Sequence, residues 1–305
     1  MSLRKGLADF FLSEKRGRAV ELSVSSLSQL YHFAIFELKK PKITLEKGML
    51  IMSVDVDVGS KELARINRGK NDANVHRCLS ERHIGEIEER ALPIFIDLFN
   101  SLGIPATFAI RGQLTETDNS ILELLLKSPI KHDVGAHGYY HRKFQSLSAE
   151  EAKSELSMIS AGLKKLGITP KSFVFPGNSV SHLRLLEKFG YECFRDYGDF
   201  QNDAMCIEKS GRLYNVRPSL YLNQSVSPFL LDRILDIAIA KKAPLHIWFH
   251  PWNLGERNEV IEKNINDVFM PFLRYAKRKE KNGVLTFETM LSAARKAEEM
   301  LTTPK

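Results

Sequence analysis

Residues 49–59 read MLIMSVDVDVG, an apolar run that ends in two aspartates, Asp55 and Asp57, placed one residue apart. Side chains two positions apart on a strand share a face and lie about 6.6 Å apart. Both carboxylates would therefore project together from the carboxyl end of a buried strand. Two like charges held side by side repel each other unless a cation is near. The stretch predicts a buried strand that leads into a metal-binding site.

From this strand onward, strand-like runs alternate with amphipathic helical stretches. Strands are expected at residues 50–54, 106–110, 132–136, 172–175, 193–195, 245–250 and 284–286. Helices are expected at 88–102 and 149–166, and the second has the capping-box pattern of Ser148 and Glu151 and ends at Gly167. Strands that alternate with helices predict an α/β fold with a largely parallel sheet.

Polar residues at strand ends distinguish two architectures that fit this alternation, an open doubly wound sheet and a distorted barrel. The chemistry-bearing residues that come at or just after the ends of different strands are Asp55, Asp57, His137, Asn178 and His250. Barrel enzymes collect their catalytic residues at this edge of the sheet. No glycine-rich phosphate loop follows the first strand, which argues against a dinucleotide-binding sheet. We therefore expect a distorted (β/α) barrel.

The chain of 305 residues is 43% hydrophobic, which is enough for one principal domain. We expect this barrel domain at residues 46–305. Residues 1–45 are expected to form an N-terminal helical extension, because apolar residues recur at roughly helical spacing until Pro41. Residues 59–82 form an insertion rich in Lys, Arg, Asn and Gly, which is either a lid over the site or a surface excursion.

Charge and cysteine content restrict the partners and the compartment. The formal net charge is +7, and the densest basic cluster, residues 274–281, is expected to be a solvated helix face rather than a nucleic-acid footprint. Three cysteines without regular spacing favour a reducing compartment over a disulfide framework. No apolar stretch is long enough for a signal peptide or a membrane span, so a cytoplasmic location is expected.

Residues 137–141 read HGYYH and place two histidines four residues apart after a strand that ends in small residues. In a helical turn, residues four apart lie on one face, a spacing that lets two imidazoles bind one metal ion. Such a pair can also be structural. Two imidazoles together with one carboxylate leave coordination positions for water and substrate, which is the arrangement of a catalytic zinc site.

Residues 245–253 read LHIWFHPWN. The alternation of a strand puts His246, Trp248 and His250 on one face and three apolar residues on the other. The apolar face should pack beneath the helices, and the other face should look into the barrel. His246 lies about 13 Å back from His250 along the strand, which favours a structural role. Trp248 is either an apolar wall for a substrate group or an ordinary core residue.

An Asp-x-Asp pair, a His-x-x-x-His pair, a Pro-centred turn after a strand and a late strand ending in His occur in this order. The chain thereby resembles the polysaccharide deacetylases, the NodB-like group of carbohydrate esterase family 4, over about residues 49–289. The resemblance implies a distorted barrel of strands and helices. It also implies metal-dependent removal of an acetyl group from an N-acetylated or O-acetylated sugar.

On the matching residues, the resemblance implies that Asp55 is the general base and His250 the general acid. It further implies that Asp57, His137 and His141 bind a divalent metal ion, with Zn²⁺ as the first candidate and other transition metals as alternatives. The family motif has adjacent aspartates, whereas one residue separates them here. An exchange of roles between the two aspartates therefore stays open.

Two later motifs depart from the family pattern. Val174, in FVFPGN, stands where the family has an arginine that steadies the catalytic carboxylate, so that function must be lost or supplied elsewhere. In the same motif the resemblance implies the Gly177 amide as an oxyanion donor, and Asn178 could add a substrate contact. In DYGDF, Asp199 resembles a family aspartate with Arg217 as the later arginine, although an ordinary turn carboxylate and a surface arginine are the alternative.

These expectations combine into a metal-dependent deacetylase of an acetylated sugar. A protein without an export signal meets precursors rather than finished polymer, so a precursor of a cell-surface polysaccharide is the expected substrate. Two alternatives stay open: an amidohydrolase of the same superfamily that acts on a small allantoin-like amide, and a non-catalytic glycan-binding protein that keeps the fold. The arginine missing at Val174 motivates the second. Product analysis separates the enzymes, because only a deacetylase releases acetate.

Overall fold

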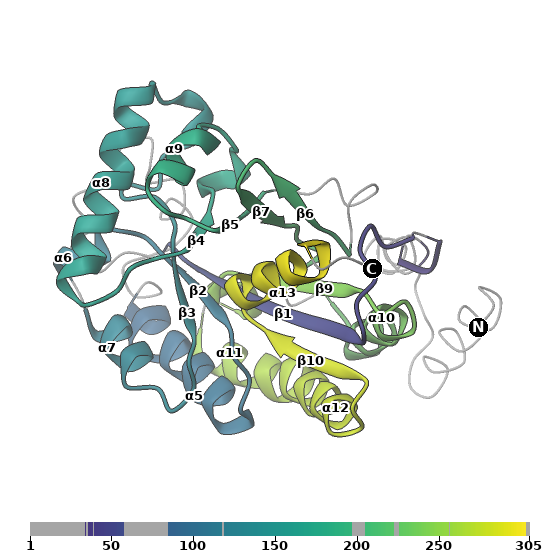
Figure 1. The fold of residues 1–305 in the computed structure, drawn as a ribbon. Helices are drawn as coiled ribbons and strands as arrows, with labels where there is room; N and C mark the ends of the chain where they lie inside the picture. Colours follow the sequence, from purple (N-terminus) through teal and green to yellow (C-terminus); the bar gives the residue numbers. More distant parts are fainter. Residues whose placement is uncertain are drawn as a thin grey trace.

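The computed structural model describes residues 34, 36–38, 40–57, 85–117, 119–196, 205–222, 226–255 and 257–302 (Figure 1). Most of the expected N-terminal extension, the insertion at 59–82 and Asp199 lie outside the described residues. Within the described ranges, no helix is both long and apolar enough to cross a membrane.

A ten-stranded sheet forms the centre of the described structure, in the order β6-β7-β5-β4-β3-β2-β1-β9-β8, with β10 paired to β1. The strands are β1 (Gly48–Val56), β2 (Thr107–Ile110), β3 (Asp133–Ala136), β4 (Ser172–Val174), β5 (Cys193–Arg195), β6 (Ile207–Ser210), β7 (Leu213–Val216), β8 (Leu220–Tyr221), β9 (Pro244–Phe249) and β10 (Leu285–Glu288). Each pair of neighbours is parallel except β6 and β7. Along one edge, β1 pairs first with β10 and then with β2, within a sheet that curls into a half-barrel (Figure 1).

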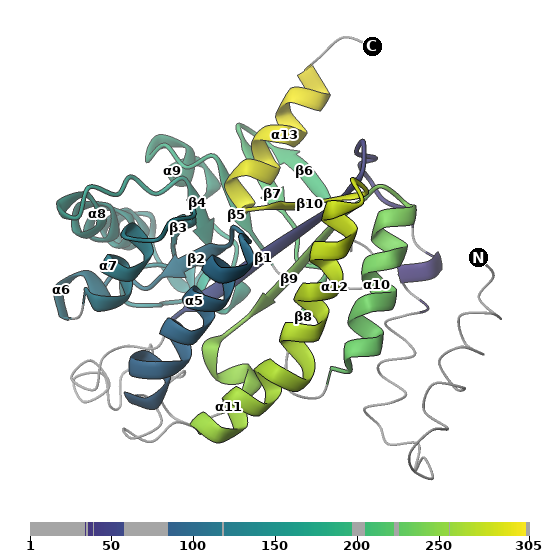
Figure 2. The same ribbon diagram turned by 90° about the horizontal axis from the view of Figure 1, so that it is seen from below.

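Helices cover the outer face of the curled sheet, and one helix packs on its inner face. The helices are α5 (Leu92–Leu102), α6 (Leu114–Thr117), α7 (Ser120–Leu126), α8 (Ala149–Lys165), α9 (Leu183–Lys188), α10 (Pro228–Ala240), α11 (Asn258–Asn264), α12 (Met270–Lys281) and α13 (Met290–Thr302). Figure 2 shows α5, α12 and α10 along one side of the sheet and α13 on the other. Helix α13 contacts β1, β5, β6, β7 and β10.

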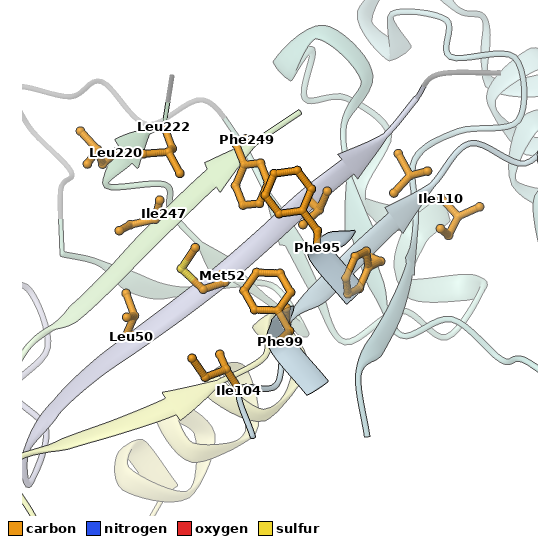
Figure 3. Packing of buried hydrophobic residues seen from close by; sticks show 14 of the residues in the cluster. Leu50, Met52, Phe95, Phe99, Ile104, Ile110, Leu220, Leu222, Ile247 and Phe249 are labelled. Carbon is orange, nitrogen blue, oxygen red and sulfur yellow. The ribbon is translucent and has the colours of Figure 1, made fainter. Parts of the chain in front are cut away.

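The outer face of β1 belongs to the main apolar core. Leu50 and Met52 lie in the same cluster as Phe95 of α5 and Phe249 of β9 (Figure 3). The ring centroids of Phe95 and Phe249 are 5.0 Å apart. Ile247 also belongs to this cluster, so the apolar face of β9 packs beneath the helices as its alternation predicts.

The inner face of β1 changes character along the strand. Met49 and Ile51 pack in a second, smaller cluster with residues of α13. Further along, the same face carries Ser53, Asp55 and Asp57, and all three are buried. Helix α13 therefore fills one end of the inner face, and polar side chains occupy the other end, at the carboxyl edge of the strands.

The α/β barrel expected from the sequence is confirmed. The first and last residues of each of the seven expected strands lie within about two residues of those of an observed strand. The capping box of α8 is also confirmed, because Ser148 Oγ accepts from the Glu151 amide and Glu151 Oε2 accepts from the Ser148 amide. The helix expected at 88–102 begins with a π-helical turn, Ile87–Ala91. The strands β6, β7 and β8 are unexpected: each is at most four residues long, β6 and β7 pair as neighbours in the chain, and β8 pairs with β9 across α10.

Candidate active site

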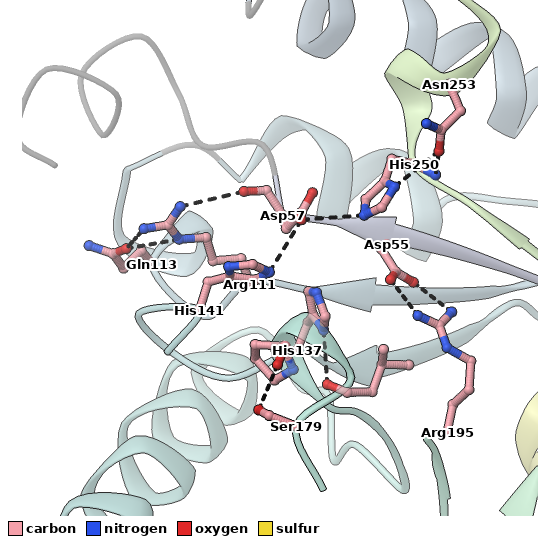
Figure 4. A network of polar contacts seen from close by, with 12 residues as sticks. Asp55, Asp57, Arg111, Gln113, His137, His141, Ser179, Arg195, His250 and Asn253 are labelled. Carbon is pink, nitrogen blue, oxygen red and sulfur yellow. Dashed lines mark hydrogen bonds and ion pairs between the residues drawn. The ribbon is translucent and has the colours of Figure 1, made fainter. Parts of the chain in front are cut away.

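Asp55 lies near the carboxyl end of β1, and Arg195 of β5 binds both of its carboxylate oxygens (Figure 4). Arg195 Nη1 donates to Asp55 Oδ1 at 2.7 Å, and Nη2 donates to Oδ2. The guanidinium lies over the Trp248 ring, 4.4 Å from its centroid. Burial alone would raise the pKa of Asp55, but the charge and the hydrogen bonds of Arg195 outweigh it, and the pKa is lowered. Asp55 is therefore ionised and held in one orientation.

Arg195 is the arginine that the sequence did not identify. It is the Cα register partner of Val174 on the neighbouring strand. A guanidinium one strand away from the family position thus reaches the same carboxylate. Arg195 follows no motif, and the signal that could have found it is the register of β4 against β5.

Arg195 is also held by Ser53 of β1, which in turn contacts His246 of β9. Arg195 Nη1 also donates to Ser53 Oγ at 2.9 Å. His246 Nδ1 lies 3.0 Å from the Val216 carbonyl oxygen, and because a carbonyl oxygen only accepts, Nδ1 carries the proton of the neutral ring. His246 Nε2 therefore accepts a hydrogen bond from the Ser53 hydroxyl, 2.8 Å away. Burial and the charge of Arg195 lower the pKa of His246 to about 3. This environment favours the structural role expected for His246.

Asp57 follows β1 directly and is buried, yet neither carboxylate oxygen has a hydrogen-bond partner among the described residues. Its Oδ2 lies 3.3 Å from His141 Nε2 and 3.7 Å from His250 Nε2. The ligand atoms of Asp57, His137 and His141 all lie within 4.8 Å of one another. A buried carboxylate without a hydrogen-bond partner is costly, and a cation bound by these three groups would offset that cost. One carboxylate and two imidazoles suit Zn²⁺ and related transition metals.

The two histidines do not lie on a helical turn, which corrects the explanation drawn from their spacing. Residues 137–141 form a bend after β3, with Gly138 at φ 68° and His141 at φ 61°. These two left-handed positions turn the backbone so that the ring centroids of His137 and His141 lie 4.8 Å apart. The imidazoles lie together as expected, but through a looped backbone.

His137 is oriented by the backbone of β4. Its Nδ1 lies 2.8 Å from the Val174 carbonyl oxygen, so Nδ1 donates its proton there and Nε2 keeps its lone pair for a metal. Burial lowers the pKa of His137 to about 4, although the charge of Asp55 acts in the opposite direction. A neutral imidazole is the form that binds a metal ion. Val174 therefore contributes through its backbone.

His250 follows β9 and faces the same carboxylate cluster. Its Nδ1 donates to Asn253 Oδ1 at 3.0 Å, which leaves Nε2 on the side of Asp57. Asn253 Nδ2 donates in turn to the Tyr221 hydroxyl. The ring of Trp252 stacks on His250 with centroids 4.4 Å apart. Asn253 and Tyr221 were not expected to act here, although the three-residue spacing from His250 to Asn253 is visible in the sequence.

Arg111 adds a buried cation beside Asp57. It follows β2, its Nη1 donates to the Asp57 carbonyl oxygen at 3.4 Å, and its Nε donates to Gln113 Oε1 at 2.9 Å. Arg111 is fully buried. It was missed by sequence reasoning, although an arginine directly after an apolar strand is a signal of the same kind as Asp55 and Asp57.

The other expected residues lie at the same edge or beyond it. Gly177 and Asn178 occupy the turn after β4, both with positive φ, and Gly177 is exposed. Trp248 is buried on the inner face, with its ring 4.5 Å from that of Tyr221. Arg217 lies 3.3 Å from a carboxylate oxygen of Asp196 and also pairs with Glu208.

Comparison with known proteins relates this geometry to a family. Residues 85–194 match the sequence model of the family described as polysaccharide deacetylase. A peptidoglycan deacetylase of Helicobacter pylori is 25% identical over 157 residues, which make up 50% of this chain and 51% of that protein. The chain thus spans about half the length of this curated relative.

Solved structures share the fold. A putative polysaccharide deacetylase from Mycobacterium smegmatis superposes with a TM-score of 0.67 at 15% identity, covering 88% of this chain and 96% of that chain. The allantoinase Puue gives 0.62 at 14% identity, with 84% and 91% covered. A probable polysaccharide deacetylase from Pseudomonas aeruginosa gives 0.60 at 14% identity, with 81% and 90% covered. At such identities these likenesses show the fold alone.

Proposed function

From the confirmed resemblance to the polysaccharide deacetylase family, we propose that this chain is a metal-dependent hydrolase that removes acetyl groups from an acetylated sugar. The observation that carries the proposal is Asp57, a buried carboxylate with no hydrogen-bond partner on either oxygen among the described residues, beside two histidines. A binding protein would have no need for such a costly group.

The proposed metal ligands are Asp57, His137 and His141, and Zn²⁺ is the first candidate ion. When bound, the ion would supply Lewis-acid activation of the acetyl carbonyl and of the attacking water. The chain's own contribution to binding is the neutral tautomer of His137, which the Val174 carbonyl holds with Nε2 unprotonated.

Asp55 is proposed to take the proton of the attacking water. Arg195 binds both of its oxygens and lowers its pKa, so the carboxylate is ionised and ready to accept a proton. Arg195 would thereby supply the positioning that the family places at Val174. Because both oxygens are engaged by the guanidinium, proton transfer would use the remaining lone pair of one oxygen.

His250 is proposed to protonate the leaving amine. Asn253 binds Nδ1 and Trp252 stacks on the ring, which directs Nε2 toward the space beside Asp57. The Gly177 amide is proposed to stabilise the developing oxyanion, and such a donor typically contributes about 3 to 4 kcal/mol. Asn178 would add a hydrogen bond to the sugar.

The proposed substrate is an N-acetylated or O-acetylated sugar that belongs to a surface polysaccharide or to its precursor. The name of the Helicobacter relative supports a glycan substrate, and the partly exposed rings of Tyr221 and Trp252 offer apolar surface for a sugar face or an acetyl methyl group. The precursor is the more specific part of this proposal.

The test begins with metal content. Wild-type protein and His137→Ala are purified without metal-affinity resin and assayed by elemental analysis, and about one transition-metal ion per chain in the wild type alone is expected. Acetate release from N-acetylated and O-acetylated oligosaccharides is then measured beside turnover of allantoin. Acetate supports the proposal, allantoin opening without acetate identifies an amidohydrolase, and glycan binding without turnover identifies a binding protein.

A further inference from the structure

Glu155 of α8 is fully buried, and its carboxylate accepts hydrogen bonds from residues 139–142. These residues belong to the segment 137–142, called the histidine loop below, which carries His137 and His141. Its Oε2 accepts from the backbone amides of Tyr139 at 2.6 Å and Tyr140 at 2.9 Å. Its Oε1 accepts from Arg142 Nε at 2.8 Å. The two amides lie between His137 and His141 in the chain, and Arg142 follows directly.

The loop needs such an acceptor because of its backbone conformation. The left-handed positions Gly138 and His141 interrupt strand geometry, so the amides between them have no sheet partner. Buried amides without a partner are costly. On its other side, the loop is held by β2 and the residues after it, since His137 N donates to the Ile110 carbonyl and Gly112 N donates to the Gly138 carbonyl, both at 2.8 Å. The loop is therefore clamped between β2 and α8.

The position of Glu155 is a core position. Its neighbours on the same face of α8, Ala152, Leu156 and Ile159, are apolar and fully buried. If this position only packed α8 against the core, another apolar side chain would suit it, because a well-packed hydrophobic residue often stabilises a fold at least as much as a buried charge. A buried carboxylate at this position therefore indicates that its hydrogen-bond partners need an acceptor. The hydrogen-bond donors to Glu155 are all in the histidine loop.

We infer that Glu155 is a positioning residue for the metal site, which sets the bend that brings His137 and His141 together. The inference rests on the proposed function, since it requires a metal ion at Asp57, His137 and His141. Groups that orient metal ligands from outside typically change metal affinity 10- to 100-fold when they are lost. Loss of Glu155 should therefore weaken metal binding beyond any effect on folding.

Glu151 provides a matched control. It lies one helical turn before Glu155 and binds the same arginine, with its Oε1 at 3.2 Å from Arg142 Nη1, but its side chain is exposed and it contacts neither Tyr139 nor Tyr140 through any hydrogen bond among those described. Both substitutions, Glu155→Gln and Glu151→Gln, remove one carboxylate charge from α8. Only the first acts on the loop, because a glutamine has a single acceptor oxygen and cannot accept both from the Tyr139 and Tyr140 amides and from Arg142 Nε.

The experiment measures Zn²⁺ affinity of the full chain by competition with a chromophoric chelator, and the visible absorption of the Co²⁺-substituted protein. We expect Glu155→Gln to bind Zn²⁺ about 10- to 100-fold more weakly with an altered Co²⁺ spectrum, and Glu151→Gln to stay within about twofold of wild type. Leu163→Ala, a cavity variant at the far end of α8, controls for lost stability and should keep the wild-type affinity and spectrum.

Each outcome decides something. Wild-type affinity and spectrum in folded Glu155→Gln overturn the inference alone, whereas a wild type that binds neither Zn²⁺ nor Co²⁺ overturns the proposed function with it. If Glu155→Gln does not fold, Glu155→Asp decides, because it keeps the buried charge but shortens the side chain that reaches the Tyr139 and Tyr140 amides. Weaker Zn²⁺ binding by Glu155→Asp at an unchanged melting temperature of the metal-free protein supports the inference, and unchanged binding overturns it.

Discussion

Asp55 and Asp57 are two residues apart on one face of one strand, yet their surroundings are opposite. Asp55 has a cation of the chain itself, Arg195, on both carboxylate oxygens. Asp57 has no hydrogen-bond partner on either oxygen among the described residues and lies beside the histidine loop. The neighbouring elements make the difference, since β5 supplies an arginine on one side and the bend after β3 supplies imidazoles on the other. One strand thus presents a carboxylate that is neutralised permanently and another suited to an exchangeable cation.

The largest effect is expected from Asp57→Asn, which removes the carboxylate charge proposed to bind the exchangeable metal ion. Bound metal should be lost and acetate release should fall by at least about a thousandfold. The metal-free protein should be no less stable than wild type, because the substitution removes a buried charge whose two oxygens have no hydrogen-bond partner among the described residues. Elemental analysis, acetate release and thermal unfolding measure the three effects. Retention of one metal ion per chain would show that Asp57 is not a ligand.

The next largest effect is expected from Arg195→Val, which removes the permanent cation. Asp55 would be left buried and unpaired, at a cost of about 3 to 5 kcal/mol in the free energy of unfolding, and misplacement of the base should reduce kcat/KM about a hundredfold. Urea unfolding and steady-state kinetics measure these changes.

The matched rescue uses the strand register. Because Val174 and Arg195 are register partners, the double variant Val174→Arg/Arg195→Val returns a guanidinium from the adjacent strand. It should recover part of both stability and kcat/KM. A double variant no better than Arg195→Val would mean that the cation must come from β5, and wild-type activity in the single variant would mean that it is not needed.

A smaller effect is expected from Asn253→Ala, which acts on His250 and leaves both aspartates unchanged. Loss of the Nδ1 acceptor should lower kcat on the order of tenfold, because general acid catalysis depends on orientation. Metal content should stay at the wild-type value. A fall in kcat together with lost metal would instead assign Asn253 to the structure of the metal site.

The smallest effect is expected beneath Asp55, in the pH dependence of stability. His246 has its pKa lowered to about 3 in the fold, against about 6.5 in an unfolded chain. The neutral ring makes its full contribution to the free energy of unfolding above pH 6.5. This contribution decreases by about 1.4 kcal/mol per pH unit as the pH falls from 6.5 toward 3. His246→Gln should therefore lose less stability than wild type between pH 7 and pH 5 in urea unfolding. Equal losses would show that the fold does not lower the pKa of His246.

The sequence was sufficient for the features that depend on local periodicity. The alternation along residues 49–57 placed Asp55 and Asp57 on one face, and the alternation along 245–250 separated His246, Trp248 and His250 from the apolar face. Each pattern is set by residues adjacent in the chain, and burial of the apolar face fixes which way the strand points.

Features that depend on long-range register or on loop conformation could not be read from the sequence. Arg195 meets Asp55 across 140 residues, although β2, β3 and β4 separate their two strands in the sheet order. The bend at 137–141 depends on two left-handed residues, of which His141 is not a residue type that signals such a conformation strongly. The contribution of Glu155 depends on this bend and was equally hidden.

The central position of β1 has a consequence for how the chain acquires its structure. Ser53 of β1 pairs with Trp248 of β9, and Gly48 pairs with Leu285 of β10. A ribosome must therefore add about two hundred residues after the first strand before its later partners exist, at about 5–20 residues per second. Once made, β2 covers part of one edge of β1, but the edge that later pairs with β9 would stay open to wrong pairing throughout that interval. Chaperone dependence during synthesis is the expected cost of building the sheet around its earliest strand.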